Sequence, residues 1–126
     1  MRLNQVTVGS SELGRSKRFY EALGLRLIVD DKRYMRFECP HGDATLSVEL
    51  VGEVMPEEQI TVYFECDDVD AELERLRVVG IEFEHPPTSM PWLWREARLR
   101  DPDGHRLCLF HAGKNRRFPP WRVDPA

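Results

Sequence analysis

Six side chains able to bind or transform a small molecule recur at alternate positions of strand-like segments in this sequence. They comprise an amide, two guanidinium groups, a carboxylate, a phenol and a thiol: Gln5, Arg36, Arg98, Glu49, Tyr63 and Cys108. Guanidinium groups can hold a polar ligand through directed hydrogen bonds, and the Glu49 carboxylate can transfer a proton. A nucleophilic thiol needs an adjacent base, which Cys108 lacks, so the pattern favours a buried inert thiol there.

Strand periodicity should place these side chains on one face of a sheet. Alternate residues of a strand face opposite sides, and one parity is apolar throughout: Val6, Val8, Met35, Phe37, Leu46, Val48, Leu50, Val62, Phe64, Ala97, Leu99, Leu107 and Leu109. We expect this parity to face the helices. The polar parity either meets solvent, as in many antiparallel sheets, or lines a trough where two modules pack edge to edge. In a trough, the six side chains would converge.

The elements that position them come from a repeat. Residues 5–27 and 61–83 each run as strand, cap, amphipathic helix, glycine and second strand, so a βα unit is duplicated. Helix caps are expected at Ser10 or Ser11 and at Asp67 or Asp68, and helix ends at Gly24 and Gly80. Strands are predicted at residues 3–8, 25–29, 34–38, 44–50, 60–65, 81–84, 94–101 and 106–110.

The expected fold class is therefore α+β, with two βαβββ modules forming a curved, mainly antiparallel sheet around a cleft. A chain of 126 residues, 41% of them hydrophobic, is expected to form a single domain with its own core. Within the domain at 1–126, module one spans 1–53, module two 58–112 and a C-terminal arm 113–126. The arm carries Pro119, Pro120 and Pro125, which predict no regular structure beyond an extended segment.

Charge and composition exclude several classes of partner. The net charge is −4 and the pI about 5.6, with both signs mixed along the chain, which argues against nucleic acid or a membrane surface. An apolar run of the roughly 20 residues that a membrane span needs is missing, as is a signal-peptide core, so the expected compartment is the cytoplasm. The three cysteines are widely spaced and predict free thiols.

Three further features leave alternatives open. The histidines at 41, 85, 105 and 111 are expected in turns or off the polar face, but a one-residue register slip would bring His111 into it. The proline-rich segment 84–94 carries Trp92 and Trp94, which either wall a site for a planar ligand or cover the end of the core. Phe118 and Trp121 in the arm should pack on their own sheet edge or on a second subunit.

At two places the sequence resembles a known family. The motif "FYEALGL" at 19–25, the motif "RLRDPDGHRLCLF" at 98–110 and the βαβββ repeat are similar to the vicinal oxygen chelate superfamily. That superfamily comprises glyoxalase I, extradiol dioxygenases and bleomycin-resistance proteins, and the resemblance covers roughly residues 2–112. It implies the glyoxalase/bleomycin resistance/dioxygenase fold and favours a homodimer.

The resemblance also implies four positions for ligands of a divalent metal. They correspond to Gln5 and Thr61 on the first strand of each module and to Glu49 and Cys108 on the last. Family members that bind a metal mostly carry histidine, glutamine and glutamate there. The set in this chain mixes a hard carboxylate with a soft thiol and a weak hydroxyl, so we expect a degenerate site and no cofactor.

Two functional hypotheses follow. The first is a metal-free protein that binds a small organic ligand through Arg36, Tyr63, Trp92, Trp94, Arg98 and Cys108. The second is a metal-dependent lyase, isomerase or dioxygenase that uses Gln5 and Glu49 as ligands, with Glu49 as the catalytic proton carrier. An accessory module acting through protein contacts has no supporting motif in the sequence.

Overall fold

The computed structural model describes residues 1–123 of the chain. Contacts between Cα atoms divide it into two compact units, here called unit 1 and unit 2. Unit 1 consists of Met1–Ile60 together with Arg100–Arg106, and unit 2 consists of Thr61–Leu99 together with the residues from Leu107 on.

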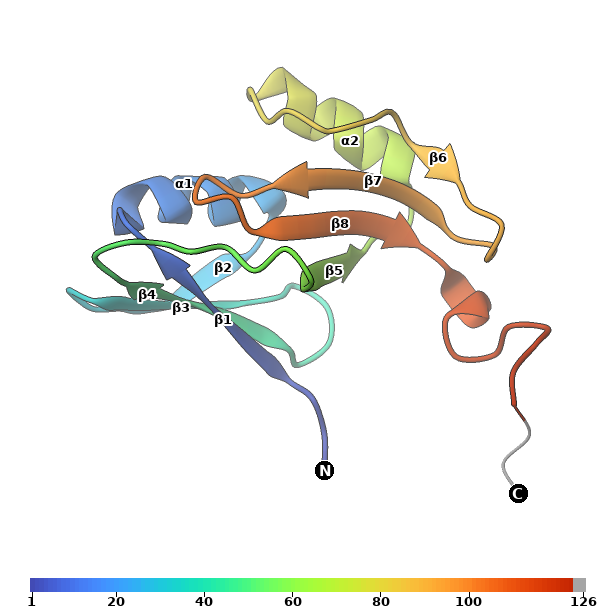
Figure 1. Cartoon of the computed structure of the whole chain (residues 1–126), viewed down its shortest axis with the longest axis horizontal. Coiled ribbons are helices and arrows are strands. Elements are labelled where there is room, and N and C mark those ends of the chain that lie inside the picture. The colour runs from blue at the N-terminus through green and yellow to red at the C-terminus, as the bar shows by residue number, and fades with distance from the viewer. Residues whose placement is uncertain (124–126) are drawn as a thin grey trace. The chain divides into compact units, whose positions relative to one another are not determined.

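Unit 1 holds one helix on a four-stranded sheet (Figure 1). Its elements are β1 (Gln5–Ser10), α1 (Leu13–Leu23), β2 (Arg26–Asp30), β3 (Tyr34–Glu38) and β4 (Thr45–Leu50). The strand order is β1-β4-β3-β2, in which β1 pairs with β4 in parallel and the other neighbours are antiparallel. Helix α1 packs against β2, β3 and β4. Tyr20, Phe37 and Val48, each fully buried, form the centre of this core.

Unit 2 repeats this arrangement. Its elements are β5 (Thr61–Glu65), α2 (Val69–Val78), β6 (Thr88–Ser89), β7 (Arg95–Arg100), β8 (Arg106–His111) and the short 3-10 helix η1 (Gly113–Asn115). The last residue of β7 and the first of β8, at the turn between them, belong to unit 1. The strand order is β5-β8-β7-β6. Leu76 of α2 is buried, as are Ala97 and Leu99 of β7 and Leu107 of β8. The predicted α+β fold with two βαβββ modules is confirmed.

The period-two pattern correctly identified most of the core. Met35, Phe37, Leu46 and Val48 of unit 1 are buried as expected, and so is Leu109 of unit 2. Both helices are followed by the predicted glycine in the left-handed region, with φ of 107° at Gly24 and 93° at Gly80. A side chain is strained in that region, which is why glycine ends helices so often.

The predicted strand at 81–84 is wrong. Within residues 1–123, this segment is reduced to a single antiparallel bridge between Phe83 and Leu99, and the pairing with β7 is completed by β6. The physical reason is the pair Pro86 and Pro87, which have no N–H to donate to a neighbouring strand. The arm also differs from expectation, because it begins with η1; Pro125 lies outside the described residues.

The cap predicted for α1 is also wrong, whereas the cap of α2 is confirmed. Asp68 accepts a hydrogen bond from the Ala71 N–H at 3.0 Å, as a capping aspartate should. The N-cap of α1 is Glu12, whose side chain makes no cap hydrogen bond within the described residues. Ser11 instead donates its N–H and its hydroxyl to Asp103, both at 3.0 Å. A carboxylate from the turn at 101–105 thus binds the residue that precedes the N-cap.

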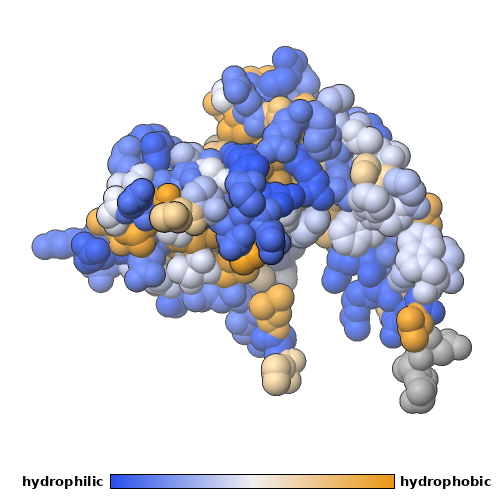
Figure 2. All heavy atoms as spheres, in the orientation of Figure 1, coloured by the Kyte–Doolittle hydropathy of each residue, from blue (hydrophilic) through white to orange (hydrophobic). Residues whose placement is uncertain are grey.

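The face of the molecule seen in Figure 2 is largely polar. Figure 2 shows hydrophilic side chains over most of the visible face, with apolar ones scattered among them. Across residues 1–123, no helix is both long enough and apolar enough to cross a membrane.

Candidate functional site

A cluster of three aromatic rings lies on the β5-β8-β7 part of the unit 2 sheet. Trp94 and Phe110 are stacked, with ring centroids 4.6 Å apart and an interplanar angle of 23°. Tyr63 meets both rings edge-on, at 6.0 Å from Trp94 and 5.6 Å from Phe110. These contacts are the favourable geometries for aromatic pairs. Tyr63 remains 44% exposed, so its ring is accessible to a ligand.

A charged pair lies beside the rings. Trp94 directly precedes β7, and Glu96 and Arg98 follow it at alternate positions, so the three side chains share one face. Arg98 donates to Glu96 at 3.2 Å and to the Tyr63 hydroxyl at 3.3 Å. The Glu96 side chain is only 3% exposed and also accepts the indole N–H of Trp92 at 2.6 Å. We call the surface formed by Tyr63, Trp94, Glu96, Arg98, Cys108 and Phe110 the aromatic face.

The polar parity of β8 is therefore buried. Of the two alternatives that the sequence left open, exposure of this parity to solvent does not apply to β8. Cys108 is fully buried and Phe110 is 4% exposed, because Trp94 packs against them. Burial raises the pKa of the Cys108 thiol to about 12, and the charge of Glu96 adds to the shift. His111 lies on the opposite parity, with Nδ1 2.9 Å from the carbonyl oxygen of Cys66. The one-residue slip of the strand that would have brought His111 onto this face is therefore not found in β8.

Unit 1 carries a separate polar cluster around Tyr34. The Tyr34 hydroxyl lies 2.5 Å from the Ser47 hydroxyl and accepts a hydrogen bond from Arg36 Nε at 3.0 Å. The bond with Ser47 holds the pKa of Tyr34 below its usual value against the opposing effect of burial, and Arg36 contributes in the same direction. Arg36 was predicted as a ligand-binding residue; in this structure it binds a tyrosine that the prediction did not include.

The residues at the four metal-ligand positions do not fit a firmly held divalent ion. In the β1–β4 register Gln5 stands opposite Thr45 and accepts its hydroxyl, whereas Glu49 stands opposite Gly9. Four residues of strand separate them, or about 13 Å. In unit 2, Thr61 offers a hydroxyl and Cys108 a thiol that stays protonated at neutral pH. Across residues 1–123, His, Cys, Asp and Glu side chains form no group of three that could hold a metal.

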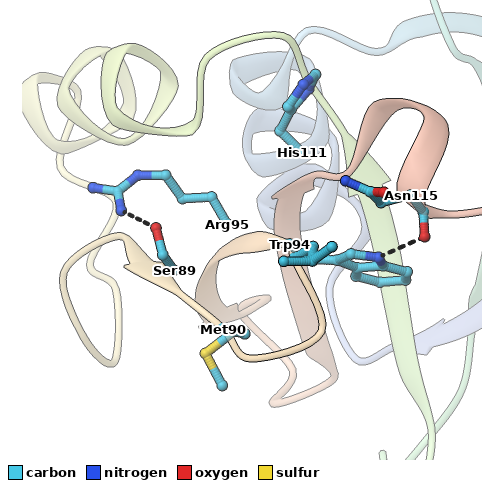
Figure 3. Close-up of a pocket in the computed structure, with 7 residues that line it drawn as sticks. Ser89, Met90, Trp94, Arg95, His111 and Asn115 are labelled. Atoms are coloured by element: carbon cyan, nitrogen blue, oxygen red, sulfur yellow. Dashed lines mark hydrogen bonds between the residues drawn. The ribbon is translucent and has the colours of Figure 1, made fainter. Parts of the chain in front are cut away.

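A pocket of about 380 Å³ opens at one end of the unit 2 sheet (Figure 3). It is lined by residues of the β6–β7 hairpin, of β8 and of η1: Ser89, Met90, Leu93, Trp94, Arg95, His111 and Asn115. The Trp94 indole N–H points to the Asn115 carbonyl oxygen at 3.5 Å, and Arg95 donates to the Ser89 hydroxyl. Trp94 thus borders this pocket and the aromatic face.

The two tryptophans of the segment 84–94 occupy different environments. Trp94 is part of the cluster, whereas Trp92 stands on the hairpin turn, 40% exposed, with its N–H on Glu96. The site prediction missed Glu96, although it lies on the same strand parity as Arg98. A carboxylate next to a proline-rich, tryptophan-bearing turn is the sequence signal that could have identified it.

Comparison with known proteins supports the architecture. The family model of the Glyoxalase/Bleomycin resistance protein/Dioxygenase superfamily matches residues 2–109. A structure of a glyoxalase/bleomycin resistance protein/dioxygenase from Nocardioides is 26% identical, with TM-score 0.72, and the match covers 89% of this chain and 83% of that chain. No curated protein gives a significant match.

Two further structures share the fold at lower identity. A bleomycin-binding protein complexed with bleomycin is 23% identical, with TM-score 0.71 and coverage of 88% of this chain and 98% of that one. A lactoylglutathione lyase from Agrobacterium tumefaciens is 18% identical, with TM-score 0.73 and coverage of 97% of both chains. On the match over residues 2–109 and the doubled βαβββ architecture, this chain belongs to the Glyoxalase/Bleomycin resistance protein/Dioxygenase superfamily.

Proposed function

We propose that this protein binds a small organic molecule with a flat aromatic group on the aromatic face of unit 2. The observation that carries the proposal is the stacked pair Trp94 and Phe110 with the partly exposed ring of Tyr63 beside it. A planar ligand gains area burial and ring contacts from such a surface. Arg98, which already contacts the Tyr63 hydroxyl, supplies a directed donor for a polar group of the ligand.

The bleomycin-binding relative supports small-molecule binding as a use of this fold. Three finer predictions from the sequence stay part of this proposal. The protein is a homodimer, and its compartment is the cytoplasm. Each chain is one domain with modules at 1–53 and 58–112 and an arm at 113–126. Arg36, which the sequence also predicted to bind a ligand, lies in unit 1, and for this residue ligand binding stays a separate proposal.

The alternative is a metal-dependent lyase, isomerase or dioxygenase that uses Gln5 and Glu49. The structural similarity to a lactoylglutathione lyase favours this alternative. The separation of Gln5 from Glu49 and the protonated thiol of Cys108 argue against it. Metal that co-purifies with the protein and is lost in Glu49→Ala would favour this alternative over ours.

A thermal-shift screen with planar aromatic compounds tests the proposal. A ligand present at 100 times its Kd stabilises the folded state by about 2.7 kcal/mol, so the melting temperature should rise by several degrees. Tyr63→Ala should abolish the rise. Phe118→Ala is the matched control, because Phe118 is another exposed ring of unit 2, 58% exposed, in the arm. If no planar compound stabilises the native protein, or if Tyr63→Ala responds like Phe118→Ala, the aromatic face is not the binding surface.

A further inference from the structure

The Glu96 carboxylate is a buried acceptor whose two oxygens have different partners. Oε1 receives Arg98 at 3.2 Å and lies 3.7 Å from the Cys108 sulfur. Oε2 accepts the indole N–H of Trp92 at 2.6 Å. A buried charge is costly unless it is hydrogen-bonded, so Oε2 needs a donor at all times.

The residue that supplies this donor is held by a strained turn. Leu93 N–H bonds to the Met90 carbonyl oxygen at 3.0 Å and Met90 N–H to the Trp94 carbonyl oxygen at 2.8 Å, which closes the β6–β7 hairpin with Pro91 and Trp92 in the turn. Leu93 has φ of 69°, the left-handed region that favours glycine in a hairpin of this type. The hydrogen bond from Trp92 to Glu96 therefore helps to hold a turn that carries strain, and its loss would let the turn relax.

The chemistry of the acceptor defines what could replace Trp92. The charge of Arg98 offsets the charge of Glu96, so the pair does not call for a cationic ligand. It calls for a directed N–H donor, and the one it now holds is part of a flat aromatic ring. The place that Trp92 would leave at Oε2 has room for an indole, and Glu96 belongs to the same aromatic face as the stacked Trp94 and Phe110 rings.

We propose that Oε2 of Glu96 is a ligand-selecting acceptor and that Trp92 occupies it as an internal competitor. The ligand class is a neutral planar heteroaromatic with a ring N–H, which takes the place of the Trp92 indole. This inference rests on the proposed binding at the aromatic face and adds the chemical group that the face selects. The competing explanation is that Trp92 and Glu96 only fasten the hairpin turn.

Indole and 1-methylindole separate the two explanations, since they differ by the N–H alone. Binding to the native protein is measured by calorimetry and by NMR of the ¹⁵N-labelled chain, in which the Trp92 side-chain N–H gives its own signal. We expect indole to bind roughly 3- to 10-fold more tightly than 1-methylindole and to displace the Trp92 signal, because one hydrogen bond is gained or lost. Glu96→Gln should reduce that preference.

Trp92→Phe gives the opposite expectations. It keeps a ring on the turn but removes the competing donor, so the affinity for indole should rise roughly 3- to 10-fold. Trp121→Phe in the arm is the matched control and should change neither affinity. Weaker indole binding in Trp92→Phe would make Trp92 a wall of the site and overturn the proposal.

The outcomes also separate this inference from the proposed function. If indole and 1-methylindole bind the native protein equally and Glu96→Gln changes neither, aromatic binding stands and the role of Glu96 falls. If neither compound binds and the wider planar screen is also negative, both proposals fall together.

Discussion

At the scale of single residues, the buried thiol of Cys108 shows how the surroundings decide chemistry. It is fully buried and lies beside the Glu96 carboxylate, and both effects disfavour a thiolate. An acid whose pKa is raised by folding stabilises the folded state only while it stays protonated. Its contribution is thus intact below the ordinary thiol pKa near 8.5 and is lost as pH rises towards about 12.

This leads to a prediction for alkylation. With iodoacetamide at pH 7.5, Cys108 of the folded protein should react far more slowly than Cys39 or Cys66, which are only partly buried. Mass spectrometry of digested samples over time gives the three rates. In denaturant the three thiols should react at similar rates, which is the control. Fast labelling of Cys108 in the native protein would show a thiolate there, and the metal-ligand interpretation of that position would return.

At the scale of elements, local sequence signals worked wherever the partner is close in the chain. Period two identified the strands, and Gly24 and Asp68 marked a helix end and a helix start. The cap of α1 failed because its partner, Asp103, is 92 residues from Ser11. Serine at 10 and 11 had the right chemistry for a cap, but only the fold shows that Ser11 donates to a carboxylate rather than accepting a backbone N–H of its own helix.

The same limit explains what was missed in the site. Tyr34 and Glu96 lie on the predicted polar parity, yet their roles depend on Ser47 and Trp92. The first partner comes from a neighbouring strand. The second comes from a turn that brings the indole back over β7, and that turn depends on a leucine in the left-handed region. Neither geometry follows from composition or periodicity.

The hydrogen-bonded carboxylate of Asp103 gives a prediction for the stability of unit 1. Its side chain is 1% exposed and accepts from Ser11, Arg15 and Ser16. Burial raises the pKa of Asp103, but these hydrogen bonds and the charge of Arg15 outweigh it, so the pKa lies below its usual value. Asp103→Asn should cost about 1–3 kcal/mol of unfolding free energy at pH 7, because the amide keeps one acceptor oxygen but loses the second one and the charge that pairs with Arg15.

The pH dependence provides the check on this prediction. A carboxyl with a lowered folded pKa stabilises the protein above its unfolded pKa near 3.9, and the stabilisation is lost as pH falls through the folded value. Denaturant titrations from pH 7 down to 3 should therefore show the native protein and Asp103→Asn converging. Asp43→Asn is the control, because Asp43 forms an exposed pair with Arg2 that contributes little. A constant difference at all pH values would rule out the charge of Asp103 as the cause.

At the scale of the whole molecule, the path of the chain links the two units. Residues 100–106 belong to unit 1, whereas the chain up to Leu99 and from Leu107 on belongs to unit 2. The turn between β7 and β8 is thus held by unit 1, where Tyr20 of α1 donates to Asp101 at 2.5 Å. Unfolding of unit 1 releases this turn, so we expect the two units to unfold together.

Tyrosine 20 and the tryptophans make this expectation measurable. Tyr20 is fully buried in unit 1, and Tyr20→Phe keeps the ring while it removes the hydrogen bond to Asp101, at a cost of about 1–3 kcal/mol. Trp92, Trp94 and Trp121 all lie in unit 2, so tryptophan fluorescence reports on that unit alone. We expect the fluorescence midpoint to fall in Tyr20→Phe by as much as the midpoint from circular dichroism, because coincident transitions mark a two-state process. Arg26→Ala, which removes an exposed ion pair with Glu38, should move neither midpoint. A fluorescence midpoint that stays in place while the dichroism midpoint falls would mean that the shared turn does not couple the units.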